Sequence, residues 1–374
     1  MEYVNLGDVA TYINGYAFKP EHRGKKGLPI IRIQDLNGNS HDLAFFDGKY
    51  PEQVEINTGD ILISWSGSLG VYKWNKGKAL LNQHIFKVLF NKIEIDKEYF
   101  CYAIRNSLSS MSQQTHGATM KHITKKDFDN ISIPYPDLIE QKKIANNLNI
   151  VNKLIMFYEK ELILFEQMVK ARFIEMFGDL KSNEKDWNLK TFEEMSVLIT
   201  DGEHSTPKRT KEGIYLLSAR NVLNHSLQLK DVDYINRDEY LRIAKRVVPK
   251  KGDILISCSG TIGRCCSVPD SLQLQMVRSV ALIRFKEVIN PIFAEYMITS
   301  DYLQEQINSS KTMSSQANLF QGKIRKLKGF LPPTELQNQF ANFVQQVDKS
   351  REEVKKSLEK TQQLYDSLMQ EYFG

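Results

Sequence analysis

Apolar residues recur at alternating intervals of four and three along two long segments of the chain. In residues 139–176 they are Ile144, Leu148, Val151, Ile155, Tyr158, Leu162, Phe165, Val169 and Met176. In residues 335–372 they are Phe340, Val344, Val347, Val354, Leu358, Tyr365, Leu368 and Tyr372. Such spacing is the seam of a coiled coil. The pattern therefore predicts two long helices that pair with each other.

Both predicted helices have start and stop signals. Each begins with the spacing of a capping box shortly after a proline and ends at a glycine. The residues concerned are Asp137, Glu140 and Gly178 in the first helix, and Thr334, Gln337 and Gly374 in the second. We therefore expect helices over residues 137–178 and 334–374.

An apolar stripe can also come from a single helix packed on a globular core, but that stripe is wider than this seam. We therefore favour the helix pair. Its seam is interrupted by Arg172, Arg351 and Thr361. If the helices run antiparallel with their ends in register, Arg351 meets Phe165 in a cation–π contact and Thr361 meets Ile155. Such a pair, about 50 Å long at 1.5 Å per residue, would act as a spacer of fixed length.

The chain contains an internal repeat. Residues 59–70 (GDILISWSGSLG) recur at 252–263 (GDILISCSGTIG), with nine of the twelve positions identical. The stretch from Gly27 (GLPIIRIQDL) similarly parallels the stretch from Gly213 (GIYLLSARNV). The two helical segments then match at a constant offset of 196 residues and both end in Phe-Gly. The chain is therefore two copies of one unit, each a globular domain followed by a helix.

The globular segments, residues 1–136 and 187–333, contain short β-branched and aromatic runs separated by Gly, Asn, Asp and Pro. Such runs predict mainly β domains with some helix. The polar stretch 179–186 is a linker between the two copies. Expected strands include 29–33, 61–63, 84–90 and 280–285, and expected helices lie around 99–110 and 292–307. The fold class is α+β, with two such domains, two long antiparallel coiled-coil helices and a pseudo-two-fold repeat.

Composition and charge narrow the functional classes. With 374 residues, 41% of them hydrophobic and 25% charged, the chain is typical of a globular protein with more than one domain. The predicted helices carry 11 basic and 12 acidic residues, so the net charge of +5 becomes +6 on the rest of the chain. This excess permits a polyanionic partner. No signal peptide, membrane span, metal-ligand spacing, phosphate-binding loop or catalytic constellation is recognisable, so we expect a cytoplasmic, non-catalytic protein.

The repeated GDILISxSG segment is explained by structure alone: Gly-Asp forms a turn, Ile-Leu-Ile a buried strand and Ser-x-Ser-Gly a tight loop. Alternatively, its serine hydroxyls and the backbone amides near the glycine contact a phosphate group. Both interpretations remain open at this point.

Polar and basic loops occur at comparable places in the two copies, although their sequences differ. A single loop of this kind is more often simply solvated, but this shared placement favours two readers of different DNA half-sites. The candidate DNA-binding residues of the first copy are Lys19, Arg23, Lys25, Lys26, Ser66, Ser68, Gln113, Thr115, His116, Thr119 and Lys121. Those of the second copy are His204, Ser205, Thr206, Lys208, Arg209, Lys211, Ser259, Thr261, Lys311, Ser314, Ser315 and Gln316.

Together these features resemble the specificity subunit of a type I restriction–modification system over essentially the whole chain. The resemblance is carried by NGYAFK at 14–19, DGEHSTP at 201–207, GDILIS at both sites, and the prolines and Glu-Gln–Ile-Ala residues that open the helices. These opening residues are Pro134, Pro136, Glu140, Gln141, Ile144 and Ala145, with Leu336, Gln337, Phe340 and Ala341 in the second copy. Because Leu336-Gln337 replaces Glu140-Gln141, the partner interface need not be symmetric.

The resemblance implies two target-recognition domains that each read one half of an asymmetric, split DNA site. It also implies that the helices dock two methyltransferase subunits and that restriction–translocase subunits join the complex. S-adenosylmethionine, ATP and Mg²⁺ would then bind those partners, and this chain would bind no cofactor. The alternatives are the specificity chain of a fused restriction enzyme, and a coiled-coil protein adaptor that does not bind DNA.

Overall fold

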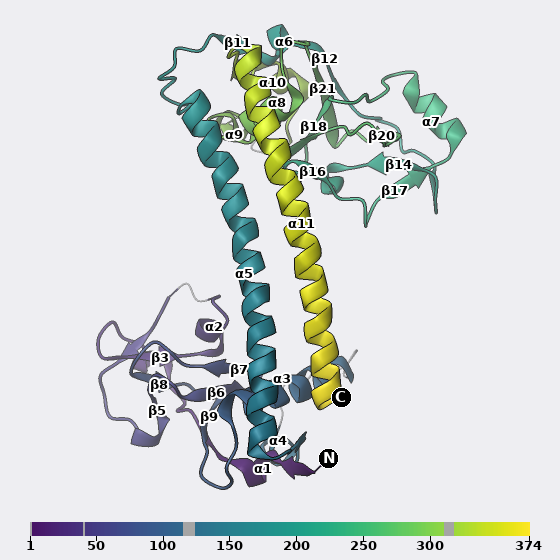
Figure 1. Ribbon diagram of the computed structural model, residues 1–374. Coiled ribbons are helices and arrows are strands. Elements are labelled where there is room, and N and C mark those ends of the chain that lie inside the picture. Colours follow the sequence, from purple (N-terminus) through teal and green to yellow (C-terminus); the bar gives the residue numbers. More distant parts are fainter. Residues whose placement is uncertain (1, 40–41, 115–123, 310–317) are drawn as a thin grey trace. The chain divides into compact units, whose positions relative to one another are not determined.

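The computed structural model describes residues 2–39, 42–114, 124–309 and 318–374 (Figure 1). The chain divides into two compact units: unit 1 comprises Met1–Glu159 and Lys356–Gly374, and unit 2 comprises Lys160–Lys355. Two long helices, α5 (Leu138–Phe177) and α11 (Thr334–Phe373), contribute a segment to each unit. Each unit is thus a β-rich domain with one segment of each long helix.

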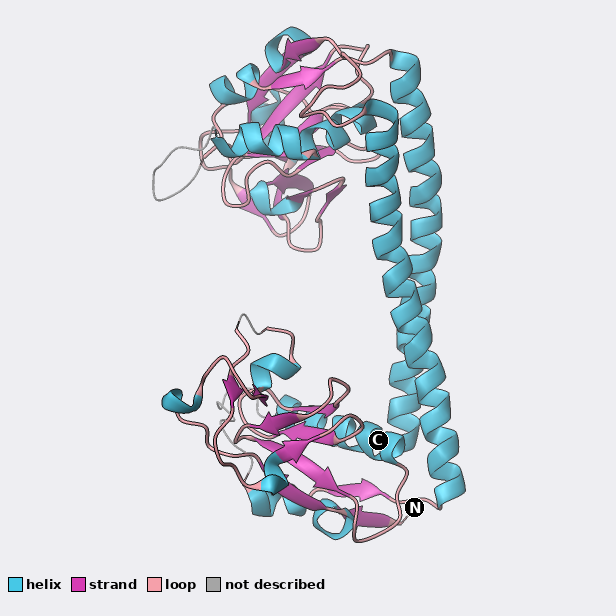
Figure 2. Ribbon diagram, turned by 90° about the vertical axis from the view of Figure 1, so that its left-hand side faces the viewer, coloured by secondary structure: helices cyan, strands magenta, loops and turns pink. Residues whose placement is uncertain are grey.

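Unit 1 contains two four-stranded sheets and several helices (Figure 2). The antiparallel sheet has the order β2 (Thr11–Asn14), β9 (Ile85–Leu89), β6 (Ile61–Ser64) and β7 (Gly70–Lys73). The mixed sheet has the order β4 (Phe45–Phe46), β3 (Leu28–Ile31), β8 (Ala79–Leu81) and β5 (Glu55–Ile56). Strand β1 (Tyr3–Asn5) pairs with β10 (Ser132–Pro134). The helices are α1 (Leu6–Val9), η1 (Pro20–His22), α2 (Ile33–Leu36), η2 (Glu52–Val54), α3 (Lys97–Gln114) and α4 (Lys125–Asp129).

Unit 2 repeats this plan. Its antiparallel sheet has the order β12 (Ser196–Asp201), β21 (Val280–Phe285), β18 (Ile254–Ser257) and β19 (Cys265–Ser267). Its mixed sheet has the order β13 (Arg209–Thr210), β17 (Asp233–Ile235), β14 (Ile214–Leu217) and β20 (Leu274–Met276). The smaller pairs are β11 (Leu189–Thr191) with β22 (Lys328–Phe330), and β15 (Val222–Leu223) with β16 (Ser226–Leu227). The helices are α6 (Phe192–Met195), η3 (Ala219–Asn221), α7 (Arg237–Ala244), α8 (Pro291–Thr299), α9 (Asp301–Ser309) and α10 (Gln321–Lys326).

The repeated GDILIS segment forms the same buried strand, β6 or β18, in both units. Its aspartate binds a basic residue of the neighbouring strand: Asp60 lies 3.2 Å from Lys87, and Asp253 lies 2.6 Å from Arg284. The aspartate directly precedes the buried strand, and it is half-buried as Asp60 and buried as Asp253. A buried carboxylate needs a partner of opposite charge, and the ion pair provides one in both units. The internal repeat read from the sequence is therefore a structural repeat.

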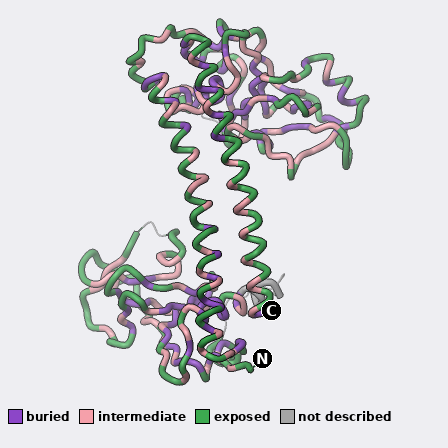
Figure 3. The backbone as a smooth tube through the Cα atoms, in the orientation of Figure 1, coloured by how far each residue is buried: buried purple, intermediate pink, exposed green. Residues whose placement is uncertain are grey.

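Much of each helix seam lies in the cores of the two units (Figure 3). Ile144 and Leu148 belong to the core of unit 1, and Phe340 and Val344 belong to the core of unit 2. The seam residues in the middle of the helices are only half-buried, namely Leu162, Phe165, Val354, Leu358 and Tyr365. The width of the stripe had argued against a helix packed on a globular core. At their ends, the two long helices nevertheless pack in this way.

Contacts inside each unit show that α5 and α11 are antiparallel. In unit 2 the ring centroids of Phe173 and Phe340 are 5.3 Å apart, and in unit 1 the Asn147 side chain donates to the Tyr372 hydroxyl at 3.3 Å. The expected cation–π contact of Arg351 with Phe165 is wrong. Arg351 pairs with Asp348 of its own helix at 3.1 Å.

Another seam arginine makes the cation–π contact. The Arg172 guanidinium lies 5.7 Å from the ring centroid of Phe343, within unit 2. This pair fits the expected register to within one residue, so the error concerned the choice of arginine. Both arginines lie at seam positions in the sequence, and only the packing of the helices shows which of them contacts an aromatic ring.

The capping boxes are only partly confirmed. Asp137 accepts a hydrogen bond from the Glu140 N–H at 2.9 Å, but the Glu140 carboxylate pairs with Lys143 at 3.2 Å. Thr334 is already inside α11 and donates to the Val288 carbonyl at 3.2 Å. The second helix therefore has no capping box among these residues, because its threonine is bound to the globular domain.

One further expectation needs correction. The helix expected over residues 292–307 is two helices, α8 and α9, because the backbone of Ser300 is extended. The predicted linker 179–186 contributes to unit 2, since Leu180 is buried in the core of that unit and the Trp187 indole that follows the segment donates to the Phe177 carbonyl at 2.8 Å. Along the described chain, none of the helices combines the length and hydropathy needed to span a bilayer.

A buried glutamine fastens the start of each long helix to its domain. In unit 1 the Gln141 side chain donates to the Pro136 carbonyl at 2.8 Å and accepts from the Asp96 N–H at 2.9 Å. In unit 2 the Gln337 side chain makes the same pair of bonds with Pro332 and Asn290, each at 2.8 Å. These glutamines were noticed in the sequence, but their anchoring role depends on distant residues.

The substitution Gln141→Ala is expected to lower the free energy of unfolding by about 1–3 kcal/mol, because it removes two half-buried hydrogen bonds, to the Asp96 N–H and to the Pro136 carbonyl. Urea unfolding of the purified chain measures this loss. The matched control is Lys142→Ala, since Lys142 is exposed on the same helical turn. Equal stabilities of the two variants would contradict the anchoring role.

Candidate nucleic-acid interface

Three loops of unit 1 meet where β2 ends. The Tyr16 N–H donates to the Leu81 carbonyl at 2.8 Å, and the Gln83 N–H donates to the Tyr16 carbonyl at 3.0 Å. A Cβ atom on Gly15 would lie 2.0 Å from the Asn82 oxygen. Only glycine therefore permits the two backbones to approach this closely.

Unit 2 repeats these contacts where β12 ends. The Glu203 N–H donates to the Met276 carbonyl at 2.9 Å, and the Arg278 N–H donates to the Glu203 carbonyl at 3.0 Å. A Cβ atom on Gly202 would lie 2.4 Å from the Met276 oxygen and 2.5 Å from the Val277 oxygen. The glycine in each of the motifs NGY and DGE thus has the same packing role.

The loop after the GDILIS strand joins from the other side. The Trp65 N–H donates to the His84 carbonyl at 3.2 Å, and the Cys258 N–H donates to the Ser279 carbonyl at 2.8 Å. We call this meeting place the loop junction; it comprises residues 14–16, 65–69 and 82–84 in unit 1, and 201–203, 258–263 and 277–279 in unit 2. Its backbone bonds are equivalent in the two units.

The side chains of the loop junction differ between the units. In unit 1 they are aromatic and neutral: the Trp65 indole donates to Asn14 at 3.1 Å and its ring lies 5.1 Å from that of His84. The amide nitrogen of Gln83 lies 3.3 Å from Nε2 of His84. Aromatic faces and amides suit stacking and hydrogen bonding to bases.

In unit 2 the loop junction is charged. Asp201 accepts from His204 at 2.7 Å and from Arg246. Glu203 accepts from Ser205 at 2.9 Å and faces Arg242 at 3.6 Å. The hydrogen bond from the Ser205 hydroxyl, together with the Arg242 charge, lowers the pKa of Glu203, so this carboxylate is held ionised beside an arginine.

The repeated serine is bound inside the loop. The Ser64 hydroxyl donates to the Ser68 carbonyl at 2.5 Å, and the Ser257 hydroxyl donates to the Thr261 carbonyl at 2.7 Å. These bonds support the structural interpretation of GDILISxSG. The phosphate-binding alternative concerns Ser66, Ser68, Ser259 and Thr261, of which Ser68 and Thr261 are exposed at the loop junction.

The structure brings some of the predicted DNA contacts to the loop junction and leaves others beside it. His204, Ser205 and Thr206 follow the junction residues of unit 2 directly and are exposed. Lys208 continues this exposed loop, Arg209 lies in β13, and Lys211 directly follows that strand; all three are exposed. Arg209 is held by Asp233 at 3.0 Å, so its charge is already paired.

Several predicted contacts lie outside the described residues: Thr115, His116, Thr119, Lys121, Lys311, Ser314, Ser315 and Gln316. For Gln113 the structure describes only its place in α3. Asn318, which directly follows one of these segments, bridges to Ser259. Asn318 therefore lies at the loop junction of unit 2.

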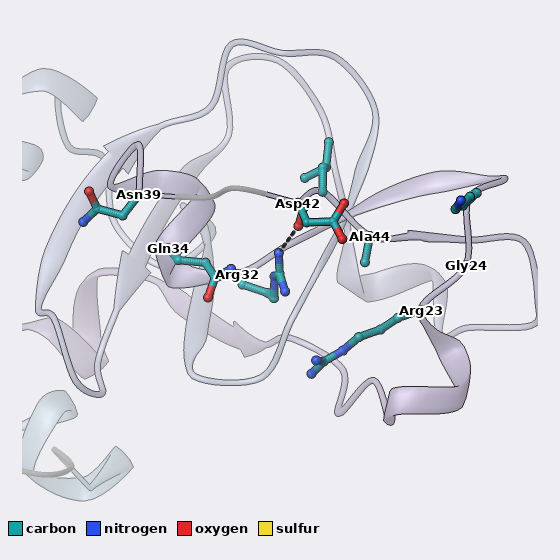
Figure 4. A pocket seen from close by; sticks show the side chains of 9 residues that line it. Arg23, Gly24, Arg32, Gln34, Asn39, Asp42 and Ala44 are labelled. Carbon is teal, nitrogen blue, oxygen red and sulfur yellow. Dashed lines mark hydrogen bonds between the residues drawn. The ribbon is translucent and has the colours of Figure 1, made fainter. Parts of the chain in front are cut away.

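A second feature of unit 1 is a basic hollow of about 460 Å³ (Figure 4). Arg23 and Lys25, two predicted contacts, line it together with Arg32. Arg32 is held by Asp35 at 3.1 Å and also donates to the Asp42 carbonyl, which lies across the hollow. Lys19 and Lys26, the other predicted contacts here, are exposed on the same loop. The charge of Arg32 is thus already paired, and Arg23 and Lys25 are the two cations of the hollow that suit a phosphate group.

Asn14, Trp65, Gln83, His84 and Arg278 were missed in the sequence. A signal was present, because a polar pair precedes a β-rich run in both copies: Gln83-His84 before β9 and Arg278-Ser279 before β21. The residue types of these pairs differ, so a search for sequence similarity between the two copies does not find them.

Among the described residues, no cluster of three metal-ligating side chains is present.

Comparisons with known proteins agree with this architecture. The family model described as "Type I restriction modification DNA specificity domain" matches residues 1–164 and 184–363. The specificity subunit of the Escherichia coli type I restriction enzyme EcoBI is 25% identical over 405 aligned residues, which cover 99% of this chain and 85% of the relative. The MjaVIII specificity subunit of Methanocaldococcus jannaschii is 24% identical and covers 97% of this chain and 91% of its own length.

Solved structures share the fold. The type I restriction–modification S subunit from M. genitalium has a TM-score of 0.61 and 15% identity, with 100% of this chain and 96% of that chain covered. A chain from a structure of type I R-M complex assembly has a TM-score of 0.58 and 14% identity, with 99% and 97% covered. The α+β fold with an internal repeat is thereby confirmed. This chain belongs to the type I restriction–modification DNA specificity family.

Proposed function

We propose that this chain gives a type I restriction–modification complex its DNA sequence specificity, with each unit reading one half of a split, asymmetric site. The observation that supports this most directly is the loop junction. Its backbone is the same in the two units, while its side chains are aromatic and neutral in one and charged in the other. Two readers built on one scaffold need this combination to recognise different half-sites.

The chain itself carries out no catalysis in this proposal. The methyltransferase subunits would bind S-adenosylmethionine, and the restriction–translocase subunits would bind ATP and Mg²⁺. The charge excess outside the long helices is small, so tight DNA binding needs the partners or specific base contacts. We expect affinity for the split site to fall steeply with rising salt.

The exposed face of α5 is proposed as the docking surface for the methyltransferase subunits. Ile150, Leu154 and Phe157 are 50%, 43% and 60% exposed in unit 1, although they are apolar. Leu164 and Met168 are 51% and 41% exposed on the segment of α5 in unit 2. Their spacing places them on one side of the helix, and exposed apolar rows of this kind mark protein interfaces.

The test is a methylation map. The chain is expressed with its methyltransferase partner in a host without adenine methylation, and modified adenines are located across the genome. We expect one bipartite motif with a fixed spacer when the chain is present and no motif without it. Methylation without sequence preference would contradict the proposal. Cleavage by the purified chain alone would favour the fused-enzyme alternative, and unchanged DNA binding after charge reversal of Lys208 and Arg209 would favour the adaptor.

A further inference from the structure

Gln83 and Arg278 occupy the same backbone position in the two units. Each N–H donates at 3.0 Å to the carbonyl of the residue after the junction glycine, which is Tyr16 or Glu203. The next residue, His84 or Ser279, accepts from the loop after the GDILIS strand in both units. The two side chains therefore start from equivalent points of the loop junction.

The guanidinium of Arg278 is exceptional in unit 2. The sequence places eleven arginines in residues 160–355, and all of them lie in described segments. Within these segments, ten have a carboxylate, carbonyl or aromatic ring as partner, for example Arg246 on Asp201 and Arg284 on Asp253. Arg278 is exposed and has no such partner there. A charged side chain held at a loop junction without an internal partner is available for an external ligand.

The change of residue type indicates which part of DNA is contacted. Every half-site presents the same phosphate groups, and both glutamine and arginine can bind them, so a contact to the backbone alone gives no reason for the residue type to differ between the units. The position instead carries a neutral amide in unit 1 and a guanidinium in unit 2. Base edges vary in this way: arginine forms a paired contact with guanine O6 and N7, and glutamine with adenine N6 and N7.

We propose that Arg278 and Gln83 are specificity-determining residues, which read a guanine in one half-site and an adenine in the other. The proposal rests on the proposed function of the chain as a two-part DNA reader. Exposed hydroxyls that both units retain in the adjoining loop, Ser68 and Thr261, fit the complementary task of contacting the sequence-independent backbone. The loop junction thus combines positions that carry a hydroxyl group in both units with positions whose side chains differ.

The experiment compares methylation maps of complexes that contain the wild-type chain, Arg278→Ala, Gln83→Ala or the control Arg237→Ala. Arg237 is an exposed arginine of the same unit, and its guanidinium packs over the Tyr240 ring. We expect Arg278→Ala to lower the preference for guanine over the other bases at one position in one half of the motif. The expected decrease is about 5- to 150-fold, which is the discrimination that one paired base contact usually provides. Gln83→Ala should relax one adenine position in the other half, and Arg237→Ala should leave the motif unchanged.

Binding of each purified complex to oligonucleotides that differ at a single base pair gives the same ratios without methylation turnover. The thermal unfolding temperature of each complex verifies folding. An unchanged motif with Arg278→Ala, or a uniform loss of affinity at every position, would overturn the inference and leave the two-part reader intact. The absence of any motif with the wild-type chain would instead overturn the proposed function itself.

Discussion

The substitution Phe340→Ala is expected to lower the free energy of unfolding of unit 2 by about 3–5 kcal/mol. Phe340 is fully buried at the start of α11, where its ring lies 5.3 Å from that of Phe173, 5.6 Å from Phe177 and 5.2 Å from Tyr296. Removal of the ring deletes contacts to α5 and to the domain core together and leaves a cavity. The loss should therefore be near the upper end for a core residue.

Trp187 provides the measurement, because it packs on the core of unit 2. Replacement of Trp65 and Trp74, the other two tryptophans, by phenylalanine makes its fluorescence report urea unfolding of this unit alone. The control is Phe320→Ala, since Phe320 is 58% exposed. Its stability should change by about 0.5 kcal/mol or less. Equal losses of unfolding free energy in the two variants would show that Phe340 does not hold α11 to the core of unit 2.

The substitution Gly202→Ala should be the next most damaging change, at about 3 kcal/mol, and should abolish recognition of one half-site. The added Cβ would meet two carbonyl oxygens at 2.4 and 2.5 Å, and backbone atoms cannot move aside as a flexible side chain can. The strand ends of unit 2 would have to separate. That movement breaks the hydrogen bonds that position Glu203 and Arg278.

The same Trp187 unfolding assay measures the stability loss, and the methylation map measures recognition. The control is Gly322→Ala in α10, where an added Cβ meets nothing within 4 Å. Alanine is favoured over glycine inside a helix, so this variant should be as stable as the wild type or slightly more so. If the Gly202 variant kept both half-sites of the motif, the close backbone approach would have no bearing on recognition.

The sequence predicted the helices well because their signal is local. A row such as Ile144, Leu148 and Val151 has the helical period over many residues, and Gly178 has a φ of +76° that ends α5. The repeated strand was equally visible, since GDILIS needs the same turn, core and loop in both copies. These features depend on residues that lie close together in the chain.

The candidate site was predicted only as a set of loops. Gln83 and Arg278 were missed because their equivalence is carried by backbone bonds to Tyr16 and Glu203, about 67 to 75 residues away, and not by similar letters. The choice of Arg172 over Arg351 for the cation–π contact likewise followed from packing. Charge and polarity could show that loops such as the one containing His204 are suited to DNA, but not which loops meet.

The sequence by itself determined the duplicated unit, the two long helices and the family resemblance, because periodicity and repeated segments act over neighbouring residues. Only the tertiary structure decided what the helix seams bury against and where the loops converge. An apolar row such as Phe340 and Val344 requires a buried partner without specifying one, and both residues pack into a globular core. A glycine such as Gly15 permits a close approach, but the second backbone comes from a strand far along the chain.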